Sequence, residues 1–264
     1  MLEFICDLAR RGGELAASLQ KNISAASSDI ERKETMRDVV TEADKQVESF
    51  IIGKIRQRFP DHGIHGEENG YVNQDSAYCW VIDPIDGTAS YIHHQPCYST
   101  SIALQYRGCS RHAAVYCPVL DELYAAEAGG GAFCNGAPIK VCDHGPLSES
   151  NVGTGFSCLR AGWKEHNNLP YFCEIAKEAR EMRRFGSAAL DLCFVAAGKL
   201  DAFWELNLQT YDIAAGTLIV LEAGGQISDL AGADNWPQQG MLASNKKLHQ
   251  KMLEFFKGYK RRGK

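Results

Sequence analysis

The chain has 264 residues, of which 45% are hydrophobic and 23% charged, with a formal net charge of -5 and a pI near 5.9. This is ordinary globular composition, and the acidic balance argues against a general nucleic-acid coat protein. The apolar runs fall far short of the roughly 18 residues that cross a bilayer, and the N-terminus lacks a signal-peptide pattern, so we expect a cytoplasmic protein without a membrane segment.

Two amphipathic helices are predicted near the N-terminus. Apolar residues recur at helical spacing over residues 2–20 and again over 41–59, where Pro60 ends the pattern. The intervening segment is polar, and we expect a loop or irregular strands there. The first third of the chain therefore begins with two helices that each have one apolar face.

The pattern changes to strands from Tyr78. Turns separate five predicted strand segments, and the dipeptide Asn135-Gly136 is a strong signal for a type I′ hairpin. We expect an antiparallel meander packed on the two early helices. Its segments cover residues 78–82, 98–107, 112–119, 122–128 and 129–141.

The second half alternates strands with helices. Predicted strands at 151–156, 180–186, 201–206 and 224–230 alternate with helices at 169–180, 187–197 and 212–223, which indicates a second α/β layer. We divide the chain into an α+β part over residues 1–145 and an α/β part over 146–264 that pack tightly together. The last segment, residues 246–264, contains eight Lys or Arg and one Glu, and we expect a basic tail projecting from an acidic body.

The ten cysteines do not indicate a disulfide framework. They are scattered along the chain and include no CxxC pair. We expect most of them to be reduced thiols that pack as small apolar residues.

One apolar strand ends in two carboxylates. Asp83 and Asp86, with the Ile85 carbonyl between them, follow YCWVI at residues 78–82. Alone, Asp-Pro-x-Asp-Gly is ordinary turn chemistry. At the end of a buried strand, however, the same residues offer hard oxygen ligands to one cation, and Mg²⁺ prefers such ligands.

The next two residues favour an anion. Gly87 permits close backbone approach, and Thr88 is predicted to cap a helix starting near Ala89, where exposed N–H groups would bind phosphate. A metal site beside a phosphate site indicates phosphate-ester chemistry. The sequence has no G-x-x-x-x-G-K-[ST] loop, which argues against a P-loop NTPase.

Two further acidic patches have structural interpretations of their own. Asp38, Thr41 and Asp44 lie in DVVTEAD, where Thr41 and Asp44 form a capping-box-like helix start. Asp212 opens an apolar helix, and an N-cap role explains it fully. As a ligand, Asp212 would supply a carboxylate to a second metal, and both interpretations stay open.

Taken together, these motifs resemble the inositol monophosphatase family of Mg²⁺-dependent phosphatases, most of all its bacterial inositol-1-monophosphatase members. The resemblance spans nearly the whole chain in the family's order. It rests on GEE at 66–68, WVIDPIDGT at 80–88, GAFCNG at 131–136, the Arg-Arg pair before GSAALD at 186–191, and YDIAAG followed by EAGG.

The resemblance implies a role for each matching residue. Glu67, Asp83 and the Ile85 carbonyl would bind a first Mg²⁺, and Asp83, Asp86 and Asp212 a second, with two or three ions per site. Glu67 and Thr88 would orient and activate the attacking water, with Asp44 supporting Thr88. Substrate contacts would come from Glu67, Ile85, Asp86, Gly87, Thr88, Arg183, Gly186, Ser187, Ala188, Glu205 and Asp212. For Arg183, a salt bridge or a subunit contact is an equally good interpretation.

The family also implies a fold and an activity. The fold would be a layered α-β-α-β-α sandwich of the inositol monophosphatase and fructose-1,6-bisphosphatase type, and the chain a lithium-sensitive homodimer that hydrolyses myo-inositol 1-phosphate or a similar polyol phosphate. Tyr211 stands where the family usually has Trp, and Ala89-Ser90 where it has Thr-Asn, so the alcohol is open. Histidinol phosphate, fructose 1,6-bisphosphate and 3′-phosphoadenosine 5′-phosphate are alternatives. A role of another class is a partner protein in bacterial transcription antitermination, with Arg183, Arg184 and the basic tail making a protein or RNA contact.

Overall fold

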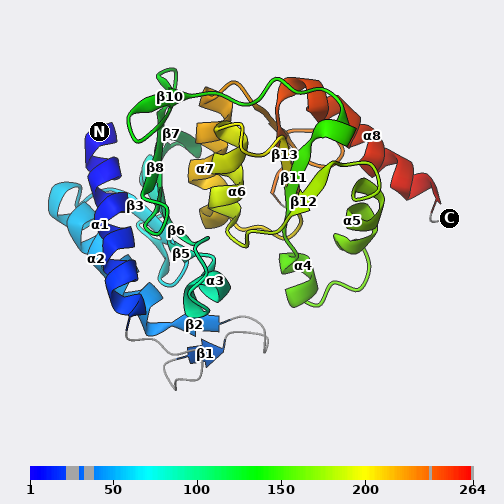
Figure 1. The fold of residues 1–264 in the computed structure, drawn as a ribbon. Helices are drawn as coiled ribbons and strands as arrows, with labels where there is room; N and C mark the ends of the chain where they lie inside the picture. Colours follow the sequence, from blue (N-terminus) through cyan, green and yellow to red (C-terminus); the bar gives the residue numbers. More distant parts are fainter. Residues whose placement is uncertain (22–29, 33–38, 238–239, 263–264) are drawn as a thin grey trace.

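The fold consists of alternating layers of helices and sheets (Figure 1). The computed structural model describes residues 1–21, 30–32, 39–237 and 240–262. A helix pair covers one sheet, a second helix pair lies between this sheet and another, and further helices cover the outer face of the second sheet. The expected α-β-α-β-α sandwich is confirmed.

Within the described residues, the first sheet has eight strands in the order β10-β9-β8-β7-β6-β5-β3-β4. Neighbouring strands are antiparallel except β3 and β5, which run parallel. The predicted meander and its hairpin are confirmed, and Asn135 and Gly136 both have positive φ, at 49° and 79°. The short strands β3 and β4 were not predicted. The bounds are β3 Gly63–Gly66, β4 Gly70–Val72, β5 Tyr78–Asp86, β6 Ser99–Tyr106, β7 Cys109–Cys117, β8 Glu122–Glu127, β9 Gly131–Cys134 and β10 Ala137–Ile139.

Helices cover both faces of this sheet. The predicted amphipathic helices form as α1 (Leu2–Gln20) and α2 (Glu42–Arg58), and they pack on one face, while α7 (Thr210–Glu222) packs on the other. Double coverage explains why β5 is a nearly continuous apolar run and does not alternate.

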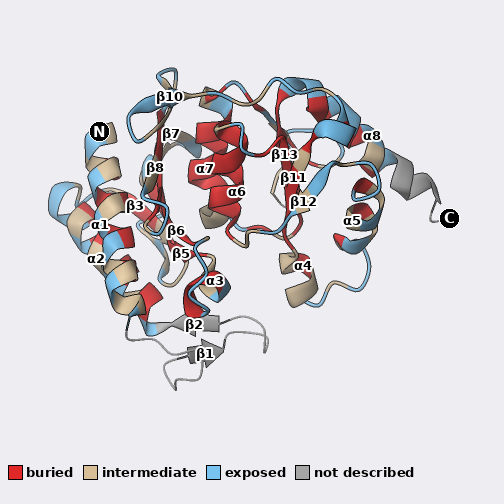
Figure 2. Cartoon of the chain, viewed as in Figure 1, coloured by how far each residue is buried: buried red, intermediate tan, exposed pale blue. Residues whose placement is uncertain are grey.

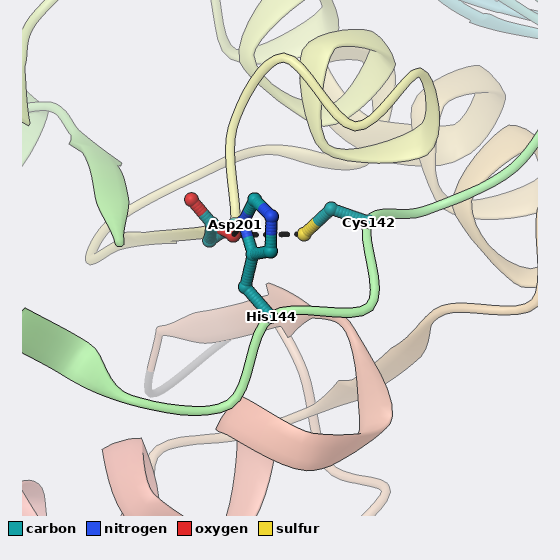
Figure 3. A group of neighbouring side chains, drawn as sticks. All are labelled: Cys142, His144 and Asp201. Carbon is teal, nitrogen blue, oxygen red and sulfur yellow. Dashed lines mark hydrogen bonds and ion pairs between the residues drawn. The ribbon is translucent and has the colours of Figure 1, made fainter. Parts of the chain in front are cut away.

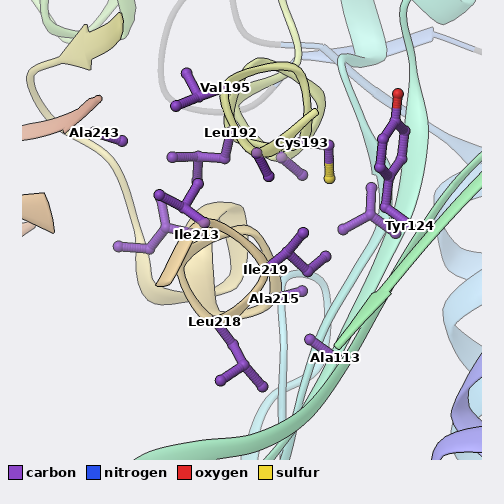
Figure 4. Packing of buried hydrophobic residues seen from close by; sticks show 14 of the residues in the cluster. Ala113, Tyr124, Leu192, Cys193, Val195, Ile213, Ala215, Leu218, Ile219 and Ala243 are labelled. Atoms are coloured by element: carbon purple, nitrogen blue, oxygen red, sulfur yellow. The ribbon is translucent and has the colours of Figure 1, made fainter. Parts of the chain in front are cut away.

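The middle helix layer is the most deeply buried part of the fold (Figure 2). Every residue of α6 (Ala188–Ala196) is buried, and α6 packs along α7, because all of its residues except Asp191 are apolar. Figure 4 shows Leu192, Ile213 and Ile219 in this contact. The same core cluster includes Val81 of the first sheet and Phe203 of the second, so the two halves share one core. The predicted boundary between residues 145 and 146 falls in the connector between the sheets.

The second sheet has five described strands in the order β12-β11-β13-β15-β14. β11 runs parallel to β12 and β13, whereas β15 is antiparallel to its neighbours. Its strands are β11 Asn151–Thr154, β12 Glu181–Arg183, β13 Ala202–Glu205, β14 Gln226–Ser228 and β15 Met241–Ser244. The remaining elements are β1 Ile30–Arg32, β2 Val39–Thr41, α3 Thr88–Ile92, η1 Leu147–Glu149, α4 Ser157–Arg160, α5 Leu169–Ile175 and α8 Lys246–Arg262.

The expected basic tail was wrong, because residues 246–262 form α8 against the second sheet. Leu248, Met252, Leu253 and Phe256 are buried in a core cluster with Trp204. Their spacing is the one-sided apolar pattern of a surface helix, and Lys246, Lys247, Lys251 and Lys257 are exposed on the remaining surface of the helix.

The state of the cysteines and the membrane-spanning character of the helices were both predicted from composition. All ten cysteines lie in the described part of the chain, and all are free thiols. Among the helices that the structure describes, none has the length and apolar character needed to cross a membrane.

Candidate active site

A cavity of about 520 Å³ opens where the ends of several elements meet. Its walls come from the ends of β3 and β5, from α3 and α4, from the turn before α6, and from the start of α7. The lining residues are Glu67, Asp83, Ile85, Asp86, Gly87, Thr88, Ala89, Ser157, Arg160, Ala161, Arg184, Gly186, Asn207, Gln209, Tyr211 and Asp212.

The parallel pair β3 and β5 delivers two acids to one edge of the sheet. Gly66 pairs with Ile82, so Glu67 and Asp83 leave the sheet side by side, and the Glu67 N–H donates to the Ile82 carbonyl at 3.2 Å. Parallel strands that end together bring residues distant in sequence into one place. This pairing is what joins the GEE and DPIDGT motifs in one site.

An irregularity in β5 turns its two aspartates toward the same cavity. Residues three apart on a regular strand point to opposite faces. The register opposite β6 shifts between Asp83 and Asp86, which pair with Ser101 and Ser99, so one extra residue is accommodated. Such bulges re-aim side chains. Thr100 fixes this one, because its Oγ1 donates to the Pro84 carbonyl at 2.8 Å.

Three carboxylates converge in the cavity. Oxygen atoms of Asp83, Asp86 and Asp212 all lie within 4.8 Å of one another. Asp83 is 1% exposed, and its Oδ1 has no hydrogen-bond partner among the described residues. A buried, unsatisfied carboxylate oxygen beside two more carboxylates fits a hard divalent cation, whose charge would compensate both the burial and the repulsion.

The electrostatics of the cluster lead to the same conclusion. Burial raises the pKa of Asp83 well above its usual value, and repulsion from Glu67, Asp86, Asp212 and Asp44 adds to it. Burial also raises the pKa of Asp86 to about 7, and burial together with the Asp86 charge raises that of Asp212. The protein therefore holds together acids that repel each other unless protons or a cation neutralise them.

Asp86 is fixed by the start of α6. Its Oδ2 accepts hydrogen bonds from Ser187 Oγ at 2.5 Å and from the Ala189 N–H at 2.7 Å. Ser187 is also the N-cap, because its Oγ accepts from the Leu190 N–H at 3.2 Å. Ser187 is therefore placed to orient Asp86, while Ser187 and Ala188 are not among the residues that line the cavity.

Asp212 has a capping role and faces the cavity as well. It is the third residue of α7, where its Oδ2 accepts from the N–H of the N-cap Gln209 at 2.6 Å in a capping box. The sequence had suggested that Asp212 is the N-cap residue, but the N-cap is Gln209. Its position among the three carboxylates is the one expected for a metal ligand.

The turn after β5 depends on glycine. Thr88 is the first residue of α3, and Gly87 is the N-cap of this helix. Thr88 Oγ1 donates to the Ile85 carbonyl at 3.3 Å. The prediction that Thr88 caps the helix was therefore wrong. Gly87 has a φ of 92°, and a Cβ there would lie 2.9 Å from the Cys97 carbonyl oxygen and 3.2 Å from that of Gly186. This turn and the turn at Gly186, both of which line the cavity, are therefore in close contact.

Neighbouring arginines have different environments. Arg183 is the last residue of β12, and its guanidinium pairs with Glu181 at 2.6 Å. Arg184 and Arg160 line the cavity, although neither was among the predicted contacts. Successive side chains of a strand point to opposite faces, so the sequence could have indicated that Arg183 and Arg184 do not face the same surroundings.

Two predicted residues lie behind the cavity wall. Glu205 is 6% exposed and accepts hydrogen bonds from the Ser157 N–H at 3.0 Å and from Ser157 Oγ at 2.8 Å, which fixes the start of α4. Asp44 is 1% exposed in the first turn of α2, which begins directly after Thr41. Asp38 lies outside the described residues.

The fold and the crowded carboxylates match one known family. The model of the Inositol monophosphatase family covers residues 1–260. The chain belongs to this family. Membership supports a phosphatase activity and accounts for a metal-binding set of acids.

Individual relatives span nearly the same length. A "Nus factor SuhB" from Pseudomonas aeruginosa is 38% identical over 259 residues, covering 96% of this chain and 94% of the relative. An "Inositol-1-monophosphatase" from Synechocystis is 41% identical over 228 residues, covering 85% and 79%. The structure of an inositol monophosphatase from Anabaena superposes with a TM-score of 0.87 at 34% identity, covering 97% of this chain and 95% of that one.

Proposed function

We propose that this protein is a Mg²⁺-dependent phosphomonoesterase that hydrolyses myo-inositol 1-phosphate or a similar polyol monophosphate. The observation that carries the proposal is one cavity with two kinds of wall. Asp83, Asp86 and Asp212 form an acidic side, and Arg160 and Arg184 line the same cavity. Acids that need a cation, beside guanidinium groups that suit an anion, fit a metal-assisted phosphate ester.

Five groups would hold the metal ions: the carboxylates of Glu67, Asp83, Asp86 and Asp212 and the carbonyl of Ile85. When bound, Mg²⁺ would neutralise phosphate charge and lower the pKa of a water molecule. The unsatisfied Oδ1 of Asp83 and the raised pKa values of the aspartates support this donor set.

The chain's own residues would orient the reactants. Glu67 and the Thr88 hydroxyl would position a water molecule for in-line attack, and backbone N–H groups at the start of α3 would hold the phosphate. A new bond forms between phosphorus and the water oxygen, the ester P–O bond breaks, and a proton from the water passes to the departing alkoxide. The products are the alcohol and inorganic phosphate.

Phosphate release would test this proposal. We would assay inositol 1-phosphate, histidinol phosphate, fructose 1,6-bisphosphate and 3′-phosphoadenosine 5′-phosphate with and without Mg²⁺. We expect fast Mg²⁺-dependent turnover of inositol 1-phosphate, inhibited by lithium. Turnover of another substrate alone would keep the reaction and change the alcohol, whereas no turnover by folded protein in Mg²⁺ would contradict the proposal.

A second candidate function is suggested by the name of the Pseudomonas relative, a Nus factor similar along almost the whole chain. A role as a partner in a transcription complex would use the surface and not the carboxylates. Asp83→Asn would then abolish hydrolysis and leave the complex intact, and a pull-down with transcription proteins would measure this. The homodimer implied by the family stays a prediction, which light scattering of the pure protein would check.

A further inference from the structure

A second cluster of metal-ligating side chains lies outside the proposed active site. Cys142 and His144 belong to the connector after β10, and Asp201 directly precedes β13. Figure 3 shows the thiol and the imidazole directed at the Asp201 carboxylate. Cys142 Sγ lies 2.8 Å and His144 Nδ1 3.1 Å from the same Asp201 Oδ1, and none of the three residues lines the active-site cavity.

The order of contacts excludes a thiol nucleophile with an imidazole base. In such a pair the imidazole takes the proton of the thiol directly. Here Asp201 Oδ1 stands between Cys142 and His144, because both donate to or contact this one oxygen. What the geometry provides is one sulfur, one nitrogen and one oxygen whose atoms all lie within 4.8 Å of one another.

Residues around the cluster hold two of the three donors in place. Asp201 is 4% exposed, and its other oxygen, Oδ2, accepts from the Asn151 N–H at 2.8 Å. Asn245 Nδ2 donates to Cys142 Sγ at 3.1 Å, while Asn245 Oδ1 accepts from the Leu248 N–H at 2.8 Å. Metal ligands are typically oriented by such outer hydrogen bonds, and a donor aimed at sulfur stabilises a thiolate.

We propose that Cys142, His144 and Asp201 bind one Zn²⁺ ion, with water as the fourth ligand. Sulfur, imidazole nitrogen and carboxylate oxygen together are a donor set that zinc favours over Mg²⁺. Tetrahedral zinc separates neighbouring donors by roughly 3.3–3.5 Å, given its usual bond lengths. On binding, the S···O distance of 2.8 Å would widen by about 0.7 Å and the N···O distance of 3.1 Å by about 0.2 Å.

The charge of the three ligands and the exposure of the site to solvent also suit a bound Zn²⁺ ion. On binding, the Cys142 S–H bond breaks, the proton goes to solvent, and the thiolate and the Asp201 carboxylate balance the two charges of the ion. The His144 side chain is 62% exposed, so the ion has a path from solvent. The bound ion would fasten the connector between the two sheets to β13 and, through Asn245, to the start of α8.

Co²⁺ titration of the full-length, chelator-treated protein would test the site. Cobalt occupies tetrahedral zinc sites, and a thiolate ligand gives it a charge-transfer absorption that carboxylate ligands do not give, so the active-site acids are silent. We expect this band to saturate at one Co²⁺ per chain and to disappear when Zn²⁺ is added. Zn²⁺ should also raise the unfolding temperature.

Variants distinguish this site from adventitious binding. Cys142→Ser should abolish the band, whereas Cys109→Ser, at an exposed thiol elsewhere, should retain it. His144→Ala changes an exposed side chain, so the protein should fold, and it should weaken Co²⁺ binding roughly tenfold or more. Absence of the band in the parent protein, or an equal band in Cys142→Ser, would contradict the zinc site. The three side chains would then form only a structural hydrogen-bond cluster.

Discussion

Two buried groups of titratable side chains in this protein differ in how their polar atoms are satisfied. The acidic cluster brings together Asp83, Asp86 and Asp212, and Asp83 Oδ1 has no partner among the described residues. By contrast, His249 on α8 is 1% exposed, and both ring nitrogens contact serine hydroxyls, Ser244 Oγ at 2.8 Å and Ser228 Oγ at 2.9 Å.

The difference separates a site from a structural contact. Buried polar groups that are fully satisfied fix a core, whereas a buried group left unsatisfied needs an explanation such as an ion or a substrate. The two groups also titrate in opposite directions. Burial lowers the pKa of His249 to about 4, and it raises the pKa of Asp86 to about 7.

The largest expected effect comes from Asp83→Asn. Loss of one metal ligand should reduce the rate of phosphate release roughly a thousandfold. In the absence of metal, the same change should stabilise the fold by about 1 kcal/mol or more, because it removes a buried charge that repels its neighbours. Burial and the neighbouring acids raise the pKa of Asp83 on folding, so the unfolded chain loses its proton first and the metal-free fold loses stability as pH rises above the usual Asp pKa. The stabilisation should therefore grow as pH rises, which thermal unfolding in chelator would measure.

The matched control is Asp229→Asn. Asp229 is also buried, but its Oδ1 accepts from the N–H groups of Ala231 and Ala233, each at 2.8 Å. This substitution should lower stability and leave turnover nearly unchanged. A fall in metal-free stability for Asp83→Asn as well would contradict the contrast between the two kinds of buried group.

The next effect is the acid sensitivity of His249. Its pKa in the fold, about 4, lies below its ordinary value of 6.5, so the unfolded chain gains a proton first as pH falls. Stability should drop by about 3 kcal/mol between pH 6.5 and 4 from this group alone. Urea unfolding of the parent and of His249→Gln across this range would measure it, since other groups cancel in the difference. Equal slopes for both proteins would count against the assignment.

A smaller effect distinguishes the two neighbouring arginines. Arg184 lines the cavity, so Arg184→Ala should lower kcat/KM about tenfold to a hundredfold through loss of a charge-assisted hydrogen bond to the substrate. Arg183→Ala is the control and should change kcat/KM less than about twofold, because its partner is the exposed Glu181. Steady-state kinetics on both variants would compare them, and a larger loss for Arg183→Ala would reverse our assignment.

The smallest expected effect concerns Ser187. Ser187→Ala removes both the N-cap of α6 and the hydroxyl that donates to Asp86. We expect a loss of about 1 kcal/mol in stability and about tenfold in activity at low Mg²⁺. The control is Ser99→Ala, which removes a buried hydroxyl that contacts Ser187 Oγ at 3.3 Å. Because this hydroxyl is not the one that donates to the Asp86 carboxylate, the Mg²⁺ dependence of the Ser99→Ala variant should stay unchanged. Identical Mg²⁺ curves for the two variants would mean that Ser187 does not orient Asp86.

The sequence alone determined the elements whose patterns are local. Helical spacing predicted α1 and α2, alternation and turn residues predicted the meander from β5 to β10, and Asn135-Gly136 predicted its hairpin. The apolar strand that ends at Asp83 and Asp86 indicated a cation site. These predictions succeeded because side-chain period, turn chemistry and caps depend on residues close together in the chain.

Only the tertiary structure decided which distant residues meet. The short strand β3 has little pattern, yet its parallel pairing with β5 places Glu67 beside Asp83. A one-residue bulge turns Asp86 to the same side, and the arrangement of β12 and α4 selects Arg184 over Arg183 and puts Glu205 behind the wall. From composition alone, residues 246–264 were predicted to be a basic tail. Only the packing of the apolar face of α8 against the second sheet shows that this segment belongs to the core. Such contacts depend on strand pairing and packing between segments far apart in the chain, which no local pattern encodes.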